Sequence, residues 1–431
     1  MSYRNKPFLL SGAFAIISLT PSLASATNGY FAHGYGARSK AMAGASTAFS
    51  QDAIAAAVNP AGLAYVGNRL DIEAELFAPF REYRVSGSPT FSQQSFDLGP
   101  GTQESESNFF PIGTLGWSHK LDDQQTIGLT LYGNGGMNTD WRQVNNASPY
   151  CGGQPGVFCA GRAGIDMAQA FLVGTYARSF DHGRYSVGIS PIFAAQTFKA
   201  RGIGSFAPFS SDPNHLSDKG RDYSFGAGFR IGGQAELIPG LRLGASYKSR
   251  IYMSDFERYA GLFAQQGGFD IPDSFNVGLS WDVNREITTN FDIEHIRYSE
   301  IKSVGNTLQP LTPGSLGNGL GPGFGWNDMT IYKFGGQWKQ NDQWTWRGGF
   351  SYGQQPIEGS EVLFNILAPG VQEWHLTGGF SHALSKQDDL SFAFMYSPQK
   401  TITGANPLSP GQSIDLSMTQ FSLQFAWSRR F

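Results

Sequence analysis

A period-two alternation of side chains recurs along most of this chain, and it constrains the fold more than any other feature. In residues 70–80, the carboxylates of Asp71, Glu73 and Glu75 alternate with apolar residues. In residues 420–428, aromatic and leucine side chains alternate with Gln, Ser and Ala. Successive side chains of a β-strand point to opposite faces, so each such segment has one apolar and one polar face. The pattern predicts an all-β chain.

The connections between these segments alternate between short and long. Short polar turns are expected at residues 121–125, 181–184, 237–241, 282–286, 339–343 and 385–389. Long loops are expected at residues 86–105, 138–164, 201–220, 257–272, 301–326, 356–370 and 401–416. This alternation is typical of a transmembrane antiparallel β-barrel with its turns on one side of the membrane and its loops on the other. We therefore predict a barrel of about fourteen strands over residues 69–431, with both chain ends on the periplasmic side.

Composition favours the barrel over a soluble all-β fold. Of the 431 residues, 14% are aromatic and 15% are charged. A soluble β-sandwich or β-helix could use the same alternation by burying its apolar face. Here, however, the apolar faces are very aromatic, and the polar faces carry small residues that offer a second sheet little to pack against. The formal net charge of −3 and the lack of a basic patch predict no nucleic-acid partner.

Residues 1–26 have the pattern of a secretory signal peptide. Arg4 and Lys6 precede an apolar run over residues 8–19, and Ala24-Ser25-Ala26 forms a cleavage site. The apolar run is shorter than a membrane-spanning helix requires. An exported barrel is expected in the outer membrane of a Gram-negative bacterium. There we expect contact with lipid and lipopolysaccharide, and with the barrel assembly machinery through the C-terminal Phe431.

Residues 27–68 differ from the rest of the chain because they are rich in Gly, Ala and Ser. We expect small-residue helices over residues 41–48 and 52–58. Pro60 disfavours the helical conformation at Asn59, so the second helix is expected to end there. We interpret this segment, called the hatch below, as a small, mostly helical domain that plugs the lumen of the barrel. An ordinary helix stop followed by a turn would explain Asn59 and Pro60 without any gating role.

The chain has two cysteines, Cys151 and Cys159, in one Gly- and Pro-rich loop. In an oxidising compartment, a disulfide between them is the expected arrangement. A metal site would need further Cys or His residues nearby, so we expect no metal.

Several motifs give the mature chain a resemblance to the FadL family of outer-membrane transporters for long-chain fatty acids and other hydrophobic compounds. They are the glycines of residues 29–44, Asn59-Pro60-Ala61, Ile271-Pro272-Asp273-Ser274, and the run 347–353 followed by Pro356-Ile357. The resemblance implies a fourteen-stranded barrel, a hatch that plugs it from the periplasmic side, and no energy source of its own. It also implies a lateral exit in the barrel wall, at an inward kink of the third strand.

The resemblance points to two sets of candidate gating residues. Asn59, Pro60, Ala61 and Gly62 lie where the family motif ends the hatch. Gly133-Asn134-Gly135-Gly136 interrupts the alternation of the expected third strand. Glycines inside a strand mark bulges or close approaches of another backbone, although a strand that ends in a glycine-rich turn would show the same residues. We interpret these four residues as the kink and the place of the lateral opening.

Two long loops contain apolar residues that we expect to be exposed and to capture hydrophobic ligand. They are Ile203, Phe206 and Phe209 in one loop, and Tyr259, Leu262, Phe263 and Phe269 in the other. One helical turn would bring the side chains at 259, 262 and 263 onto one face. Exposed apolar patches mark binding surfaces. The alternative is that the loops pack against themselves.

Charged residues of both signs fall on the expected lumenal faces. Most of them should pair, because an unpaired charge in a closed lumen is costly. Lys248 and Arg250 lie towards the loop end of one strand. They are our candidates for binding a ligand carboxylate, for which arginine is a good partner.

The run Gly349–Gly353 matches the G-x-S-x-G pattern of serine hydrolases, but it lies in an alternating strand and not at the strand-to-helix turn that this motif needs. We expect no enzymatic activity and no cofactor. With the resemblance, the expected function is passive transport of hydrophobic molecules, with long-chain fatty acids as the expected substrate. The expected steps are loop capture, lumenal binding, hatch rearrangement and lateral exit. An aromatic-hydrocarbon channel of the same family and a general porin are the alternatives.

Overall fold

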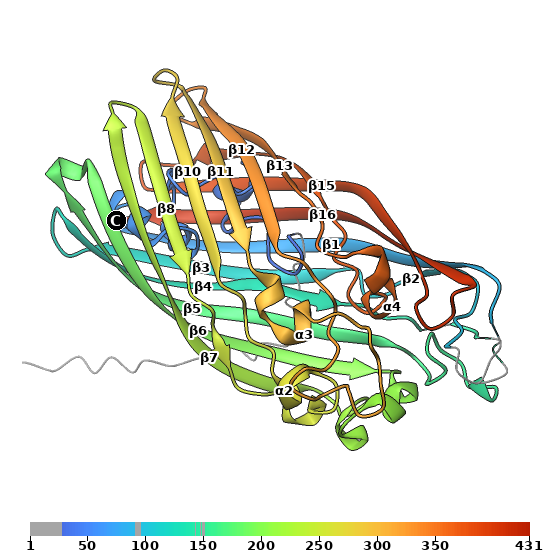
Figure 1. The fold of residues 1–431 in the computed structure, drawn as a ribbon. Helices are drawn as coiled ribbons and strands as arrows, with labels where there is room; N and C mark the ends of the chain where they lie inside the picture. Colours follow the sequence, from blue (N-terminus) through green and yellow to red (C-terminus); the bar gives the residue numbers. More distant parts are fainter. Residues whose placement is uncertain (1–27, 91–95, 143, 147, 149–150) are drawn as a thin grey trace, which may run out of the picture.

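A closed ring of antiparallel strands dominates the computed structural model of this protein, which describes residues 28–431 apart from 91–95, 143, 147, 149 and 150 (Figure 1). The predicted signal peptide lies outside the described residues. The ring consists, in order, of β1 (Arg69–Gly87), β3 (Phe110–Lys120), β4 (Gln125–Asn138), β5 (Gly164–Phe180), β6 (Tyr185–Arg201), β7 (Asp222–Ile238), β8 (Leu241–Lys248), β10 (Ser274–Asp282), β11 (Ile287–Ile296), β12 (Met329–Lys339), β13 (Trp344–Gly353), β14 (Trp374–Ala383), β15 (Asp388–Ala405) and β16 (Gln412–Arg430).

The ring closes because β16 pairs with β1 along the full length of both strands. The pairing runs from Arg69 opposite Arg430 to Gly87 opposite Gln412. Of the sixteen strands in the sheet, the short β2 (Gly101–Glu104) and β9 (Tyr252–Met253) only add to the edges of β1 and β7, which leaves fourteen in the ring. The predicted fourteen-stranded antiparallel barrel is confirmed.

The alternation in the sequence corresponds to the two faces of the barrel wall. In β1, Ile72 and Leu76 are 45% and 44% exposed, whereas Asp71, Glu73 and Glu75 are buried on the other face. The outer face is therefore an apolar band suited to lipid, and the inner face carries the polar side chains.

The short and long connections also follow the sequence, with one exception. The predicted long loop at 401–416 covers only residues 406–411, because β15 and β16 continue their pairing to Ala405 opposite Ser413. Cross-strand hydrogen bonds hold this extension: Thr401 Oγ1 lies 2.8 Å from Ser417 Oγ, and Thr403 Oγ1 donates to Asp415 Oδ1 at 2.7 Å. The prediction that all of residues 401–416 form a loop was therefore wrong, because hydroxyl-rich residues extend both strands.

All helices of the described chain are short, and none of them is long and apolar enough to cross a membrane. The hatch contains α1 (Ala37–Lys40) and the 3₁₀ helices η1 (Ala53–Ala57) and η2 (Pro60–Tyr65). The connections contain η4 (Asp181–Gly183), η5 (Gly204–Phe209), η6 (Pro213–His215), η7 (Glu257–Tyr259), α2 (Ala264–Gly267), η8 (Tyr298–Glu300), α3 (Lys302–Gly305), η9 (Gly359–Glu361) and α4 (Val362–Asn365).

The helices of the hatch differ from those predicted. No helix covers residues 41–48; α1 ends at Lys40, and Ala43 and Gly44 have positive φ values of 54° and 81°, which a right-handed helix cannot accommodate. The segment 52–58 forms the 3₁₀ helix η1, whose first turn is capped by Asp52 Oδ1 accepting from the amide of Ile54 at 3.1 Å.

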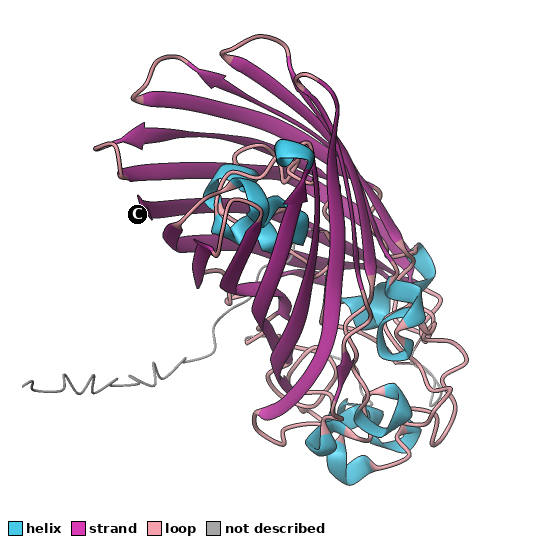
Figure 2. Ribbon diagram, turned by 90° about the vertical axis from the view of Figure 1, so that its left-hand side faces the viewer, coloured by secondary structure: helices cyan, strands magenta, loops and turns pink. Residues whose placement is uncertain are grey.

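The hatch lies inside the ring, at the end where the short turns and the C-terminus are found (Figures 1 and 2). Small lumenal residues let its backbone approach the wall closely. A Cβ added to Gly244 would lie 2.3 Å from the carbonyl oxygen of Thr47, and one added to Gly188 would lie 2.4 Å from the carbonyl carbon of Pro60. Only glycine fits at such contacts.

Buried carboxylates of the wall bind the backbone of the hatch. Asp292 Oδ2 accepts from the amides of Ser46 and Thr47, both at 2.8 Å, and from the Thr47 hydroxyl at 2.7 Å. Glu73 accepts from the amide of Ala37 at 3.0 Å, and Asp71 from that of Ala53 at 2.9 Å. The lumenal acids therefore serve mainly to hold the hatch.

Replacing Asp292 by Ala should loosen the hatch without unfolding the barrel. Two buried amides lose their acceptor, at a cost of about 1–3 kcal/mol each. We expect higher ion conductance in planar bilayers, with the heat-modifiable gel mobility of a folded barrel unchanged. The matched control is Asp342→Ala in an exposed turn. Equal conductance of both variants and the wild type would contradict this role of Asp292.

Candidate functional site

The apolar residues of the two predicted capture loops are buried, not exposed. Ile203, Phe206, Tyr259, Phe263 and Phe269 are each at most 3% exposed. The half-buried Phe209 and Leu262 pack against the same cluster. The expectation of an exposed apolar patch is therefore wrong, and the alternative of loops that pack against each other describes the structure.

Contacts between different loops explain this burial. The ring of Phe206 lies 5.3 Å from that of Phe158 and 5.0 Å from that of Phe364, both in other loops. Tyr259 packs edge-on to Phe198 of β6 at 4.8 Å, and its hydroxyl donates to the carbonyl of Gly220 at 2.5 Å. The loop end of the barrel is thus closed by a shared apolar core.

A small, wholly apolar cavity lies within this core. Its volume is about 20 Å³, close to the space that one water molecule needs. Its lining residues come from several loops and strand ends: Ile165, Phe198, Ile203, Phe206, Leu262, Leu316, Phe324, Phe364 and Leu367. A hydrophobic ligand could occupy it only if these side chains move apart.

The first described residues of the hatch continue this apolar core. Tyr30 packs against Tyr298, Trp326 and Phe269, with ring centres 5.0, 5.8 and 6.1 Å apart. The Tyr298 hydroxyl donates to the carbonyl of Asn28 at 2.5 Å. Residues 28–32, called the N-terminal segment below, therefore lie between the loop core and the barrel wall.

The predicted kink residues break the pairing of β4 on both sides. Against β5, the register shifts between Gly133 and Gly135, so that Asn134 is bulged. Against β3, the pairing stops at Leu115 opposite Leu131, although β3 begins at Phe110. Beyond this point the described parts of β3 and β4 form no ladder with each other.

The N-terminal segment pairs with β4 where β3 does not. The amide of Gly136 donates to the carbonyl of Tyr30 at 3.0 Å, and the amide of Ala32 donates to that of Asn134 at 3.1 Å. A Cβ added to Gly135 would lie 1.7 Å from the Tyr30 carbonyl oxygen, so this position requires glycine. The bend thus directs β4 towards the hatch, as a kink and not as a terminal turn.

The Asn-Pro-Ala motif is anchored to the wall. Asn59 Nδ2 donates to the carbonyls of Thr47 and Gly233 at 2.9 and 3.0 Å, and its Oδ1 accepts from the amide of Ala61 at 3.1 Å. Pro60 begins η2, so Asn59 is the N-cap of a further helix as well as a stop. A Cβ on Gly62 would lie 1.7 Å from Ser50 Oγ. Any movement of the hatch here must break these contacts.

The two predicted carboxylate-binding residues have other contacts. Arg250 pairs with Asp270 at 2.8 Å. Lys248 is buried, with its Nζ 4.0 Å from the centre of the Phe31 ring, so the N-terminal segment covers it. Sequence reasoning did not single out Arg81, although the alternation of β1 places it on the inward face. Arg81 is buried and lines two cavities.

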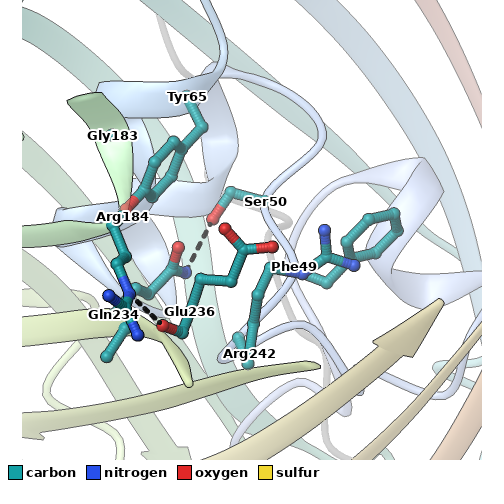
Figure 3. Close-up of a pocket in the computed structure, with 10 residues that line it drawn as sticks. Phe49, Ser50, Tyr65, Gly183, Arg184, Gln234, Glu236 and Arg242 are labelled. Carbon is teal, nitrogen blue, oxygen red and sulfur yellow. Dashed lines mark hydrogen bonds between the residues drawn. The ribbon is translucent and has the colours of Figure 1, made fainter. Parts of the chain in front are cut away.

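Another cavity lies at the turn end, between the hatch and strands β7 and β8 (Figure 3). Its volume is about 230 Å³. Gln234 Nε2 donates to Ser50 Oγ at 3.2 Å across one side, and the Arg242 guanidinium lies 5.2 Å from the Phe49 ring. Charged residues line this end, in contrast to the apolar loop end.

The G-x-S-x-G run lies within β13, and no strand-to-helix turn is present there. Ser351 Oγ is 3.2 Å from His375 Nδ1, and the His375 ring stacks on that of His33. Burial lowers the pKa of His33 well below its ordinary value, and the positive charge of Lys40 lowers it further, so this hatch residue is neutral. No group of three or more metal-ligating side chains occurs among the described residues.

The loop between β4 and β5 is tied together covalently and by charge. Cys151 and Cys159 form a disulfide, with their Cα atoms 4.9 Å apart. Burial would raise the pKa of Asp140, but hydrogen bonds from Arg162 and Arg142 outweigh burial and hold the pKa below its ordinary value. The described part of this loop also joins the apolar core, through the contact between the Phe158 and Phe206 rings.

The fold and the filled lumen together define an outer-membrane channel protein. The sequence matches the family described as outer membrane protein transport protein (OMPP1/FadL/TodX) over residues 16–419. The chain belongs to this family, whose members transport hydrophobic compounds across the outer membrane of Gram-negative bacteria. Comparison with curated proteins gave no match.

Solved structures show the same fold at low sequence identity. A FadL homologue of Pseudomonas aeruginosa is 15% identical, with a TM-score of 0.67 over 94% of this chain and 100% of that chain. The toluene transporter TodX of Pseudomonas putida is 16% identical, with a TM-score of 0.65 over 93% and 99% of the two chains. The toluene transporter TbuX of Ralstonia pickettii is 17% identical, with a TM-score of 0.58 over 93% and 99%. These likenesses concern the fold alone.

Replacing Gly135 by Ala should detach the N-terminal segment from β4, because the added methyl group overlaps the Tyr30 carbonyl. We expect the amides of Ala32 and Gly136 to exchange with deuterium at least tenfold faster. The control is Gly113→Ala in β3, where an added Cβ meets nothing within 4 Å. Unchanged exchange in the Gly135 variant would contradict the close packing described here.

Proposed function

We propose that this protein conducts hydrophobic molecules passively across the outer membrane, with long-chain fatty acids as its principal substrate. The observation that carries the proposal is one continuous apolar cluster that joins the loop core to the kink. It includes Phe206 and Phe263 under the loops, Trp326 and Tyr298 below them, and Phe31 beside β4. Such a path suits an apolar chain and offers nothing to hydrated ions.

Entry of the ligand begins at the loop end in this proposal. The loop core is closed, and its apolar cavity is far smaller than a fatty acid. The ligand must therefore replace the contacts that these side chains make with one another, at little cost because apolar contacts are non-directional. Capture is an opening of the loop core and not adsorption onto an exposed patch.

Departure of the ligand takes place sideways, between β3 and β4. The inner face of β3 carries an apolar group at this level: Phe110 and Ile112 pack with Phe77 of β1. The missing ladder between the two strands supports this exit, because separating them further breaks no backbone hydrogen bond. A laterally released hydrophobic molecule passes directly into the lipid.

The hatch responds to the ligand through the N-terminal segment. Tyr30 and Phe31 pack in the apolar cluster and at the same time pair with β4. A ligand that enters the cluster competes for the same contacts and shifts the segment. The ligand can shift the segment only to the extent that it binds the shifted state more tightly than the unshifted state.

Two alternative functions predict different experimental results. Transport of monoaromatic hydrocarbons is favoured by the aromatic lining of the path, and two of the similar structures are toluene transporters. Growth on oleate and on toluene, compared in a strain lacking this protein, separates the two substrates. A general porin would show a large and steady ion conductance.

A disulfide across the kink should block transport reversibly. A Cβ on Gly133 would lie 3.1 Å from Ile112 Cγ2, so the pair Ile112→Cys and Gly133→Cys can bridge β3 and β4. We expect oleate uptake to fall at least fivefold after oxidation and to recover after reduction. The wild type, treated in the same way, controls for the native disulfide.

A second pair tests whether the position of the bridge matters. Trp117→Cys and Leu129→Cys join the same strands where they already pair, so uptake should not change. Normal uptake through an oxidised bridge at 112 and 133 would place the exit elsewhere.

A further inference from the structure

Arg81 of β1 is a buried cation with no counter-ion among the described residues. Its side chain faces the lumen and is 6% exposed. Its Nε and Nη2 atoms have no hydrogen-bond partner, and the described residues provide no ion pair for its guanidinium. The Phe110 ring lies against the guanidinium, with its centre 5.6 Å from Cζ. Burying an unpaired charge is costly unless another group compensates it.

Other cations on the inner side of the barrel have compensating groups. Lys333 pairs with Glu294 at 2.7 Å, and Arg242 with Asp282 at 2.6 Å. Arg230 donates to the carbonyl of Val58 at 2.7 Å. Lys248 also has no carboxylate partner, but the rings of Phe31 and Phe171 lie against its Nζ. Arg81 differs from Lys248 because it lines two cavities.

Two cavities meet at Arg81. One lies on the lumenal side, where Arg81 shares the lining with Met137 and Asn138 of β4, with Trp326 and with Met418 of β16. β3 lies between β1 and β4 in the sheet order, but it begins at Phe110, opposite Phe77, and so does not extend to Arg81. Residues of β1 and β4 therefore line one cavity here.

The second cavity has a volume of about 220 Å³. Arg81 and Met418 line it as well, together with Asn108 in the connection before β3 and with Phe80, which is 41% exposed on the outer face of β1. Glu82 and Glu104 also line this cavity, but the structure records no ion pair between either of them and Arg81. Arg81 thus stands between the lumenal cavity and one that reaches towards the outside of the wall.

The chemistry of this place suits one kind of ligand. A guanidinium can bind both oxygens of a carboxylate through two parallel hydrogen bonds. Apolar contacts to the hydrocarbon chain of such a carboxylate are available around Arg81 from Phe110, Met137, Trp326 and Met418. A neutral hydrocarbon would leave the guanidinium uncompensated.

We propose that Arg81 binds the carboxylate of the transported molecule beside the kink, and that the channel thereby prefers hydrophobic carboxylates to neutral molecules of the same length. This inference rests on the proposed function, because it assigns the substrate class to the same path. It replaces two earlier candidates for the carboxylate-binding residue: Lys248, which the N-terminal segment covers, and Arg250, which pairs with Asp270.

Equilibrium binding of two ligands of equal chain length tests the proposal. The probes are radiolabelled oleate and oleyl alcohol, measured at alkaline pH with the full-length protein purified in detergent. In Arg81→Gln, oleate should bind at least tenfold more weakly, and oleyl alcohol should bind within twofold of the wild type. Arg81→Lys, which keeps the charge but not the planar fork, should recover part of the oleate affinity.

The control variant is Arg178→Gln, which removes an exposed cation at the turn end of β5 and should change neither affinity. Heat-modifiable mobility verifies that each variant is folded. Unchanged oleate affinity in Arg81→Gln, or an equal loss for both ligands, would overturn the proposal while leaving transport of hydrophobic molecules intact. A wild-type protein that binds neither ligand would overturn the proposed function and this inference together.

Discussion

Hydrogen bonds between buried wall carboxylates and the backbone of the hatch hold the interior of this barrel together. A carboxylate in a closed lumen is costly unless it is hydrogen-bonded, and so is a buried backbone amide. Asp71, Glu73 and Asp292 satisfy both needs at once, because each accepts from a hatch amide. In an empty barrel, the same carboxylates would lack these donors and would destabilise the fold. The wall and the hatch are therefore complementary, and neither is satisfied alone.

Much of the fold could be predicted because a strand shows its two faces in its sequence. The alternation through Asp71, Glu73 and Glu75 sufficed to place the inner and outer faces of β1. The length of each strand and its cross-strand contacts were harder to predict. The end of β15 depends on cross-strand bonds such as that between Thr403 and Asp415, which no local pattern reveals.

The candidate site was predicted less well, for a related reason. Phe206 and Phe263 were correctly chosen as apolar loop residues, but their burial is due to contacts between loops that are far apart in sequence. Arg81 was overlooked because a charged residue on an inward face is expected to find a partner. Only the three-dimensional arrangement shows that its Nε and Nη2 atoms have no hydrogen-bond partner in the described part of the chain.

The pairing of the N-terminal segment with β4 gives the channel a restoring force. Displacing Tyr30 leaves the amide of Gly136 without its acceptor in a place that water reaches poorly, at a cost of about 1–3 kcal/mol. That cost is repaid as soon as the segment returns, so the displaced state relaxes spontaneously once the ligand has left. In the proposed function, the channel would therefore reset after each passage with no energy beyond the ligand's own binding. In the structure, residues 28–32 occupy the place beside β4 that β3 leaves unpaired.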